Sequence, residues 1–344
     1  MDVTRERLLA LPKTDLHVHL DGSLRPETML ELAREMGVTL PARDPAALAA
    51  HMRVDDAANL VDYLARFEIT LALMQSADVL ERIAYELAED AARENVRYLE
   101  VRFSPVLNTR AGLTLEAVLD AVLRGLRRAE QDFDIVTGVI VCALRHLAAE
   151  TSLALARLTV AYKNRGVVAF DLAGPEEDHP PKRHLPAFEL AADANMAITI
   201  HAGEAFGPRS IHQALHRCHA RRIGHGTHLG DDADLLAFVR DFHIPIEICL
   251  TSNVQTRAVR SFAAHPLRRF YDEGIVLSLC TDNRLMSATT VTDEYRHAHE
   301  QLGFTWHELC ELAVSGFEAA FLPEPRRRDL VREVREEISR VPGS

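Results

Sequence analysis

The chain has 344 residues, of which 47% are apolar and 26% charged, and its formal net charge is −12. This composition is ordinary for a globular protein with a sizeable core, and the surplus of acids excludes a broad basic surface for nucleic acid. The five cysteines are widely spaced and odd in number, which argues against a disulfide framework. No apolar run approaches the ~20 residues of a membrane helix, and the N-terminus lacks the apolar core of a signal peptide. We therefore expect a cytoplasmic protein with no membrane or nucleic-acid partner.

Short segments rich in apolar and β-branched residues are predicted to be strands, and stretches with apolar residues three and four apart are predicted to be the helices between them. The eight strand segments are residues 14–20, 96–103, 135–143, 167–172, 197–201, 222–225, 245–250 and 275–280. Strands that alternate with helices pair in parallel through right-handed crossovers, and eight such units indicate a (β/α)8 TIM barrel. A doubly wound sheet is the rival arrangement, but it usually needs fewer strands.

The interval between the first two strands is long, and most of it has helical periodicity, at residues 26–36, 59–75 and 80–93. We interpret it as a helical insertion after strand 1, which would cap the active face of the barrel, followed by the helix of that unit. The sequence contains no repeat, low-complexity tract or Pro/Gly/Ser linker. It is therefore predicted to form one domain over residues 1–344.

Polar residues of unusual type follow several of the predicted strands directly. They form the motifs HVHLD at 17–21, DLAG at 171–174, HAGE at 201–204, HG at 225–226 and TDN at 281–283. The C-terminal ends of all strands in a (β/α)8 barrel meet on one face, where the active sites of this fold are built. The shared offset of these motifs predicts that they form a single site.

The motif HVH places two histidines on the same side of a strand, because side chains two apart in a strand point the same way. His17 and His19 would then project together into the barrel mouth. Two neutral imidazoles suit a divalent transition metal, and His201 and Asp282 would complete a set of nitrogen and oxygen ligands. A set without thiolates is typical of a catalytic centre with one position open for water. We expect one Zn²⁺ per chain, although the ligand types also suit Fe²⁺, Co²⁺ or Mn²⁺.

Two further ionisable residues are expected beside this metal. Glu204 follows His201 by three residues and could act as a general acid or base, and His225 on the neighbouring strand could orient or deprotonate the attacking water. The competing interpretation of Glu204 is a carboxylate that interacts with the N-terminus of the next helix.

Taken together, the motifs resemble the adenosine deaminase family of the metal-dependent amidohydrolases. The matching blocks are TDLHVHLDGSL, RYLEVRFSP, DLAG, HAGE, RIGHGTHL, EIC with TSN, and TDN, in the order of the family and over most of the chain. HAGE followed by GHG and TD is the specific part, whereas HxH alone would indicate only the wider superfamily. The resemblance implies zinc-dependent conversion of adenosine or deoxyadenosine to the 6-oxo nucleoside and ammonia.

The resemblance also implies a role for each site residue. Zinc would be bound by His17, His19, His201 and Asp282, with His19 also facing the substrate. Glu204 would protonate purine N1 while zinc-bound hydroxide attacks C6, and His225 would hold or deprotonate that hydroxide. The backbone of Gly174 would contact N3, and Asp21 would bind the ribose 5′-hydroxyl. The implied partner is a small purine nucleoside, and nothing in the sequence indicates an oligomeric state.

Two positions depart from the commoner family pattern. Many members have a second aspartate after the strand-eight ligand, where this chain has Asn283, whose amide can donate to purine N7 without needing a proton. Many members also have an acid directly after DLAG, where this chain has the loop 175–181 that begins with Pro175. Both changes bear on substrate identity more than on reaction type.

Other functions compete with adenosine deamination. Within the class, adenine or aminodeoxyfutalosine could be the substrate, although relatives that act on free adenine tend to have Glu where Asp21 lies. A purine-nucleoside binder that has lost catalysis is the main alternative outside it, but binding alone does not require Glu204. A purely structural zinc is weaker still, because a barrel of this size has core enough without one.

Overall fold

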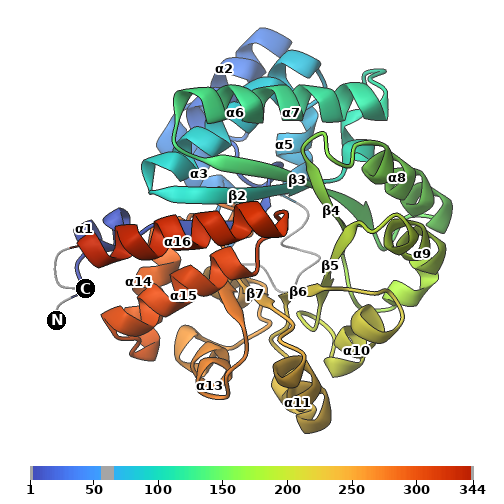
Figure 1. Ribbon diagram of the computed structural model, residues 1–344. Coiled ribbons are helices and arrows are strands. Elements are labelled where there is room, and N and C mark those ends of the chain that lie inside the picture. Colours follow the sequence, from blue (N-terminus) through green and yellow to red (C-terminus); the bar gives the residue numbers. More distant parts are fainter. Residues whose placement is uncertain (1–2, 56–65, 342–344) are drawn as a thin grey trace.

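Eight parallel strands in sequential order form a nearly closed barrel, as predicted (Figure 1). The computed structural model describes residues 3–55 and 66–341. The strands are β1 (Lys13–His19), β2 (Val96–Phe103), β3 (Val136–Leu144), β4 (Val167–Ala173), β5 (Ala197–Ala202), β6 (Arg222–His225), β7 (Ile246–Ile248) and β8 (Leu277–Leu279). A parallel bridge between Val18 and Asp282 joins the first strand to the segment that follows the last. The doubly wound alternative is therefore wrong.

The helices lie around the outside of the barrel, which is the arrangement that right-handed crossovers produce (Figure 1). Those after β2 are α7 (Leu115–Asp132), α8 (Ala149–Ala161), α9 (Leu185–Asp193), α10 (Pro208–His216), α11 (Ala233–Asp241), α12 (Leu250–Gln255), α13 (Leu267–Asp272), α14 (Val291–Leu302), α15 (Trp306–Glu318) and α16 (Glu324–Arg340). Short 3-10 turns lie at Pro105–Asn108, Pro181–His184, Leu229–Asp231 and Phe262–Ala264. Local signals fix several helix ends, such as the capping box of Thr305 and Glu308 at the start of α15.

The predicted helical insertion follows β1. A short helix, α1 (Arg5–Ala10), precedes that strand, and α2 (Pro26–Met36), α3 (Pro45–Met52), α5 (Phe67–Leu73) and α6 (Ala77–Arg93) follow it. Of the helix expected over residues 59–75, the part at 59–65 lies outside the described residues. Helix α3 was not predicted, although Asp44 caps it by accepting from the backbone N–H of Ala47 at 2.9 Å and Pro45 begins it.

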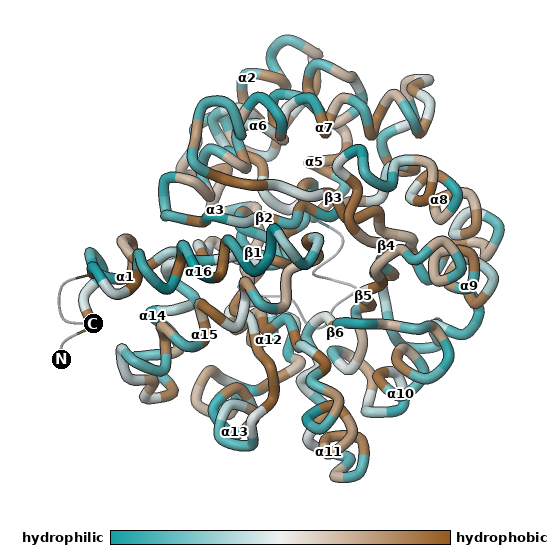
Figure 2. The backbone as a smooth tube through the Cα atoms, in the orientation of Figure 1, coloured by the Kyte–Doolittle hydropathy of each residue, from teal (hydrophilic) through white to brown (hydrophobic). Residues whose placement is uncertain are grey.

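Hydropathy follows the layers of the barrel, with apolar residues concentrated on the strands and on the inner faces of the helices (Figure 2). The amphipathic α6 and α7 pack side by side and bury one stripe each, including Leu87 and Leu126. Strands β7 and β8 are three residues long, shorter than predicted. The chain leaves β7 after Ile248 to begin α12. Within residues 3–55 and 66–341, no helix is long and apolar enough to cross a membrane.

Candidate active site

The polar residues at the strand ends surround one cavity of about 440 Å³ at the C-terminal mouth of the barrel. Residues from β1, β4, β5, β6 and the segment after β8 meet there, so the predicted convergence is confirmed. The insertion also contributes, because Phe67 and Leu71 of α5 line the same cavity. The predicted site residues on its wall are His19, Asp21, Gly174, His201, Glu204, His225, Asp282 and Asn283.

A cluster of ligand-type side chains lies at the floor of this cavity. One ligand atom from each of His17, His201, His225 and Asp282 lies within 4.8 Å of the others, and all four residues are buried. His19 joins them, since its Nε2 is 3.1 Å from Nε2 of His201 and 3.4 Å from Oδ1 of Asp282. The four ligands expected from the sequence are therefore together, and His225 lies among them. Three imidazoles and a carboxylate at this spacing suit a divalent transition metal.

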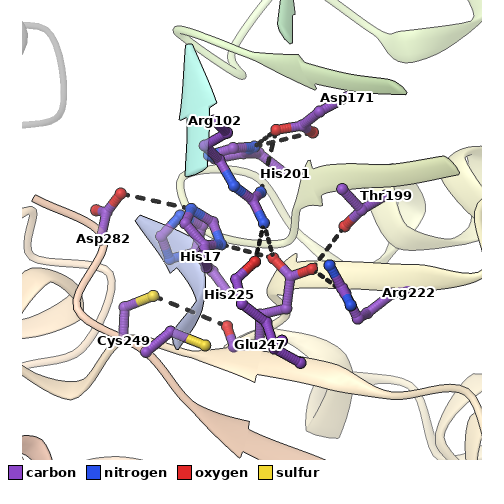
Figure 3. A network of polar contacts seen from close by, with 12 residues as sticks. His17, Arg102, Asp171, Thr199, His201, Arg222, His225, Glu247, Cys249 and Asp282 are labelled. Atoms are coloured by element: carbon purple, nitrogen blue, oxygen red, sulfur yellow. Dashed lines mark hydrogen bonds and ion pairs between the residues drawn. The ribbon is translucent and has the colours of Figure 1, made fainter. Parts of the chain in front are cut away.

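Two buried carboxylates fix the tautomers of two of these histidines (Figure 3). Nδ1 of His17 lies 2.7 Å from Oε2 of Glu247, and Nδ1 of His201 lies 3.1 Å from Oδ2 of Asp171. Because a carboxylate accepts, each Nδ1 donates and each Nε2 keeps its lone pair. Nε2 of His17 is buried and has no hydrogen-bond partner among the described residues. These lone pairs aimed at one point fit a metal ion.

A network of paired charges holds the two carboxylates in place inside the barrel (Figure 3). Arg102 bridges them, donating from Nη2 to Glu247 at 2.8 Å and from Nη1 to Asp171 at 3.1 Å. Glu247 also accepts from Arg222 and, at 2.8 Å, from the hydroxyl of Thr199. The ionised side chains of this network are fully buried, so loss of one partner would leave an uncompensated charge, at a cost of about 3–5 kcal/mol. The barrel interior thus supports the ligands directly.

The seam of the barrel positions Asp282. Its backbone N–H donates to the carbonyl of His17 and its carbonyl accepts from the N–H of His19, both at 2.7 Å. This places Oδ1 at 3.4 Å from Nε2 of His17, while Oδ2 accepts from the hydroxyl of Ser252 at 2.6 Å. Asp282 has a φ of +60° and His225 one of +65°, a left-handed conformation that costs a non-glycine residue free energy and is common at functional sites.

Glu204 lies against the cluster and is only 5% exposed. Its Oε2 is 3.6 Å from Nε2 of His225, and its Oε1 has no hydrogen-bond partner among the described residues. Burial raises the pKa of this carboxyl, and the charge of Asp282 adds to the rise. Because α10 begins only at Pro208, Glu204 is not a first-turn carboxylate of that helix. A buried acid with a raised pKa is a candidate proton donor.

The loop after β4 contributes an acid that was not predicted to belong to the site. Glu176 accepts four backbone hydrogen bonds, from Gly203 at 2.7 Å, Glu204 at 3.1 Å, Ala205 at 2.8 Å and Phe206 at 2.9 Å. Its buried carboxylate therefore fixes the segment that carries Glu204.

The residues expected to face a purine also line this cavity. Asp21 is 7% exposed, burial raises its pKa to about 7, and its Oδ1 has no hydrogen-bond partner among the described residues. Gly174 has a φ of +96°, a conformation that glycine adopts at low cost. Asn283 is buried against Gly22, where a Cβ would come within 1.9 Å of the amide oxygen.

Several supporting residues were missed because none stands at the end of a predicted strand motif. The missed set comprises Arg102, Glu176, Glu247, Ser252, Asn253 and His265, whereas Asp171 was singled out in the DLAG motif but given no role. A usable signal did exist, since ionised residues inside apolar strands are rare unless they are paired or bind a ligand. Arg102 and Glu247 are both of this kind.

Comparisons with known proteins agree with this geometry. A family model described as adenosine deaminase matches residues 12–337. The adenosine deaminase of Mycobacteroides abscessus is 43% identical over 341 residues, covering 94% of each protein. A probable adenosine deaminase of Dictyostelium discoideum is 40% identical over 333 residues, which cover 96% of this chain but only 43% of that protein. Among solved structures, the adenine deaminase of Arthrobacter aurescens has a TM-score of 0.89 at 27% identity, covering 96% of this chain and 99% of that one. The N6-mAMP deaminase of arabidopsis has a TM-score of 0.86 at 31% identity, with the same coverage.

Proposed function

The chain belongs to the adenosine deaminase family of metal-dependent hydrolases, and we propose that it converts adenosine and deoxyadenosine to inosine and deoxyinosine with release of ammonia. One observation carries the proposal. The Nε2 lone pairs of two histidines converge with a carboxylate beside Glu204, in a cavity that Asp21 and Asn283 also line. A nucleoside binder would need no acid with a raised pKa at the metal-ligand cluster.

We propose zinc as the metal, one ion per chain, held by His17, His19, His201 and Asp282. The support is that a divalent metal would satisfy the buried Nε2 of His17 and would separate the facing Nε2 atoms of His19 and His201. When bound, zinc supplies a Lewis acid that makes water a nucleophile at neutral pH.

The chain's own residues carry the remaining steps of the proposed reaction. Glu204 would donate a proton to purine N1, which makes C6 more electrophilic, and its raised pKa favours the protonated form that this requires. His225 would hold the attacking oxygen at C6, since its Nε2 lies 3.6 Å from Oε2 of Glu204 and both residues line the cavity. The apolar side chains of Phe67 and Leu71, which line the cavity, would limit access of bulk water.

The proposed substrate is a neutral nucleoside. Asp21 would accept from the 5′-hydroxyl, the backbone of Gly174 would contact N3, and the amide of Asn283 would donate to N7. Of the described residues that line the cavity, four are carboxylic acids, Asp21, Glu68, Glu204 and Asp282, and none is a lysine or arginine. A 5′-phosphate would lack the cationic partners that it usually has in proteins. We also propose that residues 1–344 act as one domain, because the site draws on both the first and the last strand.

A substrate panel tests this proposal. Ammonia release and the loss of the adenine absorbance band are measured with adenosine, deoxyadenosine, adenine, AMP and aminodeoxyfutalosine. We expect kcat/KM for adenosine to exceed that for AMP by at least ~10²-fold, because like charges placed together cost several kcal/mol. Equal or better turnover of AMP or adenine would overturn the substrate assignment.

Metal analysis of the same preparation tests the ligand assignment. We expect about one equivalent of zinc in the purified protein and loss of most of it in His17→Ala. His307→Ala is the matched control, because the His307 side chain is 84% exposed and lies outside the cavity. A metal-free protein that keeps full activity in a chelator would refute the metal-dependent mechanism.

A further inference from the structure

A chain of three buried hydrogen bonds leads from the backbone of α13 to His225. The backbone N–H of Leu267 donates to Nδ1 of His265 at 3.1 Å. Nε2 of His265 lies 3.1 Å from Oδ1 of Asn253, and Nδ2 of Asn253 lies 3.0 Å from Nδ1 of His225. These four residues are at most 4% exposed. The chain therefore connects the site to a part of the fold that is not on the cavity wall.

The direction of donation along this series of hydrogen bonds is fixed at the end that lies on α13. A backbone N–H can only donate, so Nδ1 of His265 accepts and the proton of this imidazole is on Nε2. Burial lowers the pKa of His265 to about 3, so the ring is neutral. Its Nε2–H must donate to the amide oxygen of Asn253, and the amide nitrogen then donates to Nδ1 of His225. The lone pair of His225 is thereby used at Nδ1, and its proton is on Nε2.

His225 differs in this respect from two histidines with which it shares the cluster. His17 and His201 donate from Nδ1 to Glu247 and Asp171, which leaves Nε2 free to bind a metal. Spacing alone groups His225 with these ligands, because all the ligand atoms lie within 4.8 Å of one another. His225 differs from these ligands because its Nε2 carries a proton. This Nε2 lies 3.6 Å from Oε2 of Glu204.

We propose that Asn253 and His265 are positioning residues that hold His225 in its Nε2–H tautomer, so that His225 is a hydrogen-bond donor to the reacting oxygen and not a metal ligand. This inference rests on the proposed function for the identity of that oxygen, but the tautomer itself does not. A base or a ligand at Nε2 would need its lone pair there, and the chain of hydrogen bonds places a proton there instead. A donor aimed at the oxygen stabilises the negative charge that develops on it as C6 is attacked.

Asn253→Asp reverses the polarity with almost no change in shape. A carboxylate at this position accepts from His265 and also from His225, which moves the His225 proton to Nδ1. We expect kcat for adenosine to fall by about 10²-fold, the usual effect of losing one donor to a developing oxyanion, with KM within a few-fold. His265→Gln is the conservative counterpart, because its amide N–H can still donate to Asn253. We expect it to keep the parent tautomer and most of the activity.

Nitrogen NMR of protein labelled in its histidines measures the tautomer without reference to activity. The His225 signals are assigned by their loss in His225→Gln, and spectra are recorded with and without zinc. The parent and His265→Gln should show a proton on Nε2 of His225 in both states, and Asn253→Asp should show it on Nδ1. A parent spectrum with the proton on Nδ1, or loss of the Nε2 proton when zinc binds, would overturn the proposal even if Asn253→Asp does not fold. If no purine is deaminated but the tautomers are as expected, only the proposed function fails.

Discussion

Replacement of Glu176 should impair catalysis although this residue does not line the cavity. Its carboxylate accepts from four consecutive backbone N–H groups, of which those of Gly203 and Glu204 belong to buried residues. Ala205 and Phe206 are exposed, so their backbone N–H groups can instead donate to water. The segment that carries the proposed proton donor is therefore held by a charge on the loop after β4.

The size of the effect follows from which bonds each substitution removes. Oε2 of Glu176 accepts from three of the N–H groups and Oε1 accepts from Gly203 alone. Glu176→Gln can keep its carbonyl at the position of Oε2, but its NH2 then faces the N–H of Gly203. The loss of one charge-assisted bond costs about 1.5–3 kcal/mol. Glu176→Ala loses all four hydrogen bonds. The two donors that are buried, the N–H groups of Gly203 and Glu204, are then left unpaired, at a cost of about 3–6 kcal/mol. We expect the segment to rearrange rather than bear this cost.

Steady-state kinetics across pH and thermal unfolding together test this reasoning. We expect kcat to fall by ~10-fold in Glu176→Gln and by ~10²-fold in Glu176→Ala, the lower end of what a positioned acid contributes. Glu204 must be protonated to donate, so activity falls as pH rises through its pKa. Burial and the charge of Asp282 raise that pKa most, and the charge of Glu176 also raises it, so Glu176→Gln should move this limb to lower pH.

The neighbouring residue provides the control. Glu177→Gln makes the same chemical change on the same loop, but Glu177 is exposed, so activity, pH profile and unfolding should stay those of the parent. Parent-like kcat and an unshifted pH limb in both Glu176 variants would refute the assigned role. A lower unfolding temperature with no shift in the high-pH decline of activity would mean that Glu176 has only a structural role.

Three further predictions concern other parts of the chain. Glu204→Gln should lower kcat by ~10²–10⁴-fold with zinc content unchanged, and activity within a few-fold of the parent would exclude Glu204 as proton donor. If Asn283 donates to N7, 7-deazaadenosine should lose about 5- to 150-fold in kcat/KM, since a buried unpaired donor costs ~1–3 kcal/mol, and equal turnover of the two nucleosides would remove this contact. Burial raises the pKa of Glu294 from 4.5 to about 7, so the folded state holds this proton more tightly and stability falls as pH rises from 4.5 through 7. Glu294→Gln should therefore gain about 3 kcal/mol in denaturant unfolding relative to the parent over that interval, and a constant difference would contradict the shift.

The fold could be predicted from the sequence because its signals are local and repeated. The helix at Pro26–Met36 has its bounds as predicted, with Pro26 at the start and Gly37 in the left-handed conformation after its end. The short strands β7 and β8 were overestimated, since the apolar residues that flank them are buried outside the sheet and periodicity cannot separate the two cases. Propensity and capping decide local structure, whereas the length of a central strand depends on its neighbours.

The candidate site could be predicted only as far as its residues lie at strand ends. That rule places His17, His201 and Asp282 together, because the topology of the barrel brings all strand ends to one face. It says nothing of Glu176, which acts through the backbone of a segment 27 to 30 residues away in the sequence. A carboxylate that binds main-chain N–H groups leaves no side-chain pattern at its target, so only the structure identifies it.

The chemical role of each histidine is the part of the site that depends most on the tertiary structure. An imidazole offers a lone pair or a proton at Nε2 according to what its Nδ1 contacts, and that contact is made 28 to 230 residues away in the sequence. Glu247 and Asp171 therefore leave the Nε2 lone pairs of His17 and His201 free for the proposed metal, while Asn253 makes His225 a donor. The charge network that fixes these imidazole tautomers also fills the barrel interior. A substitution in it that changes the role of a histidine therefore also changes which charged groups are buried in the core. Metal binding and the folding of the barrel are thus coupled through the same buried carboxylates.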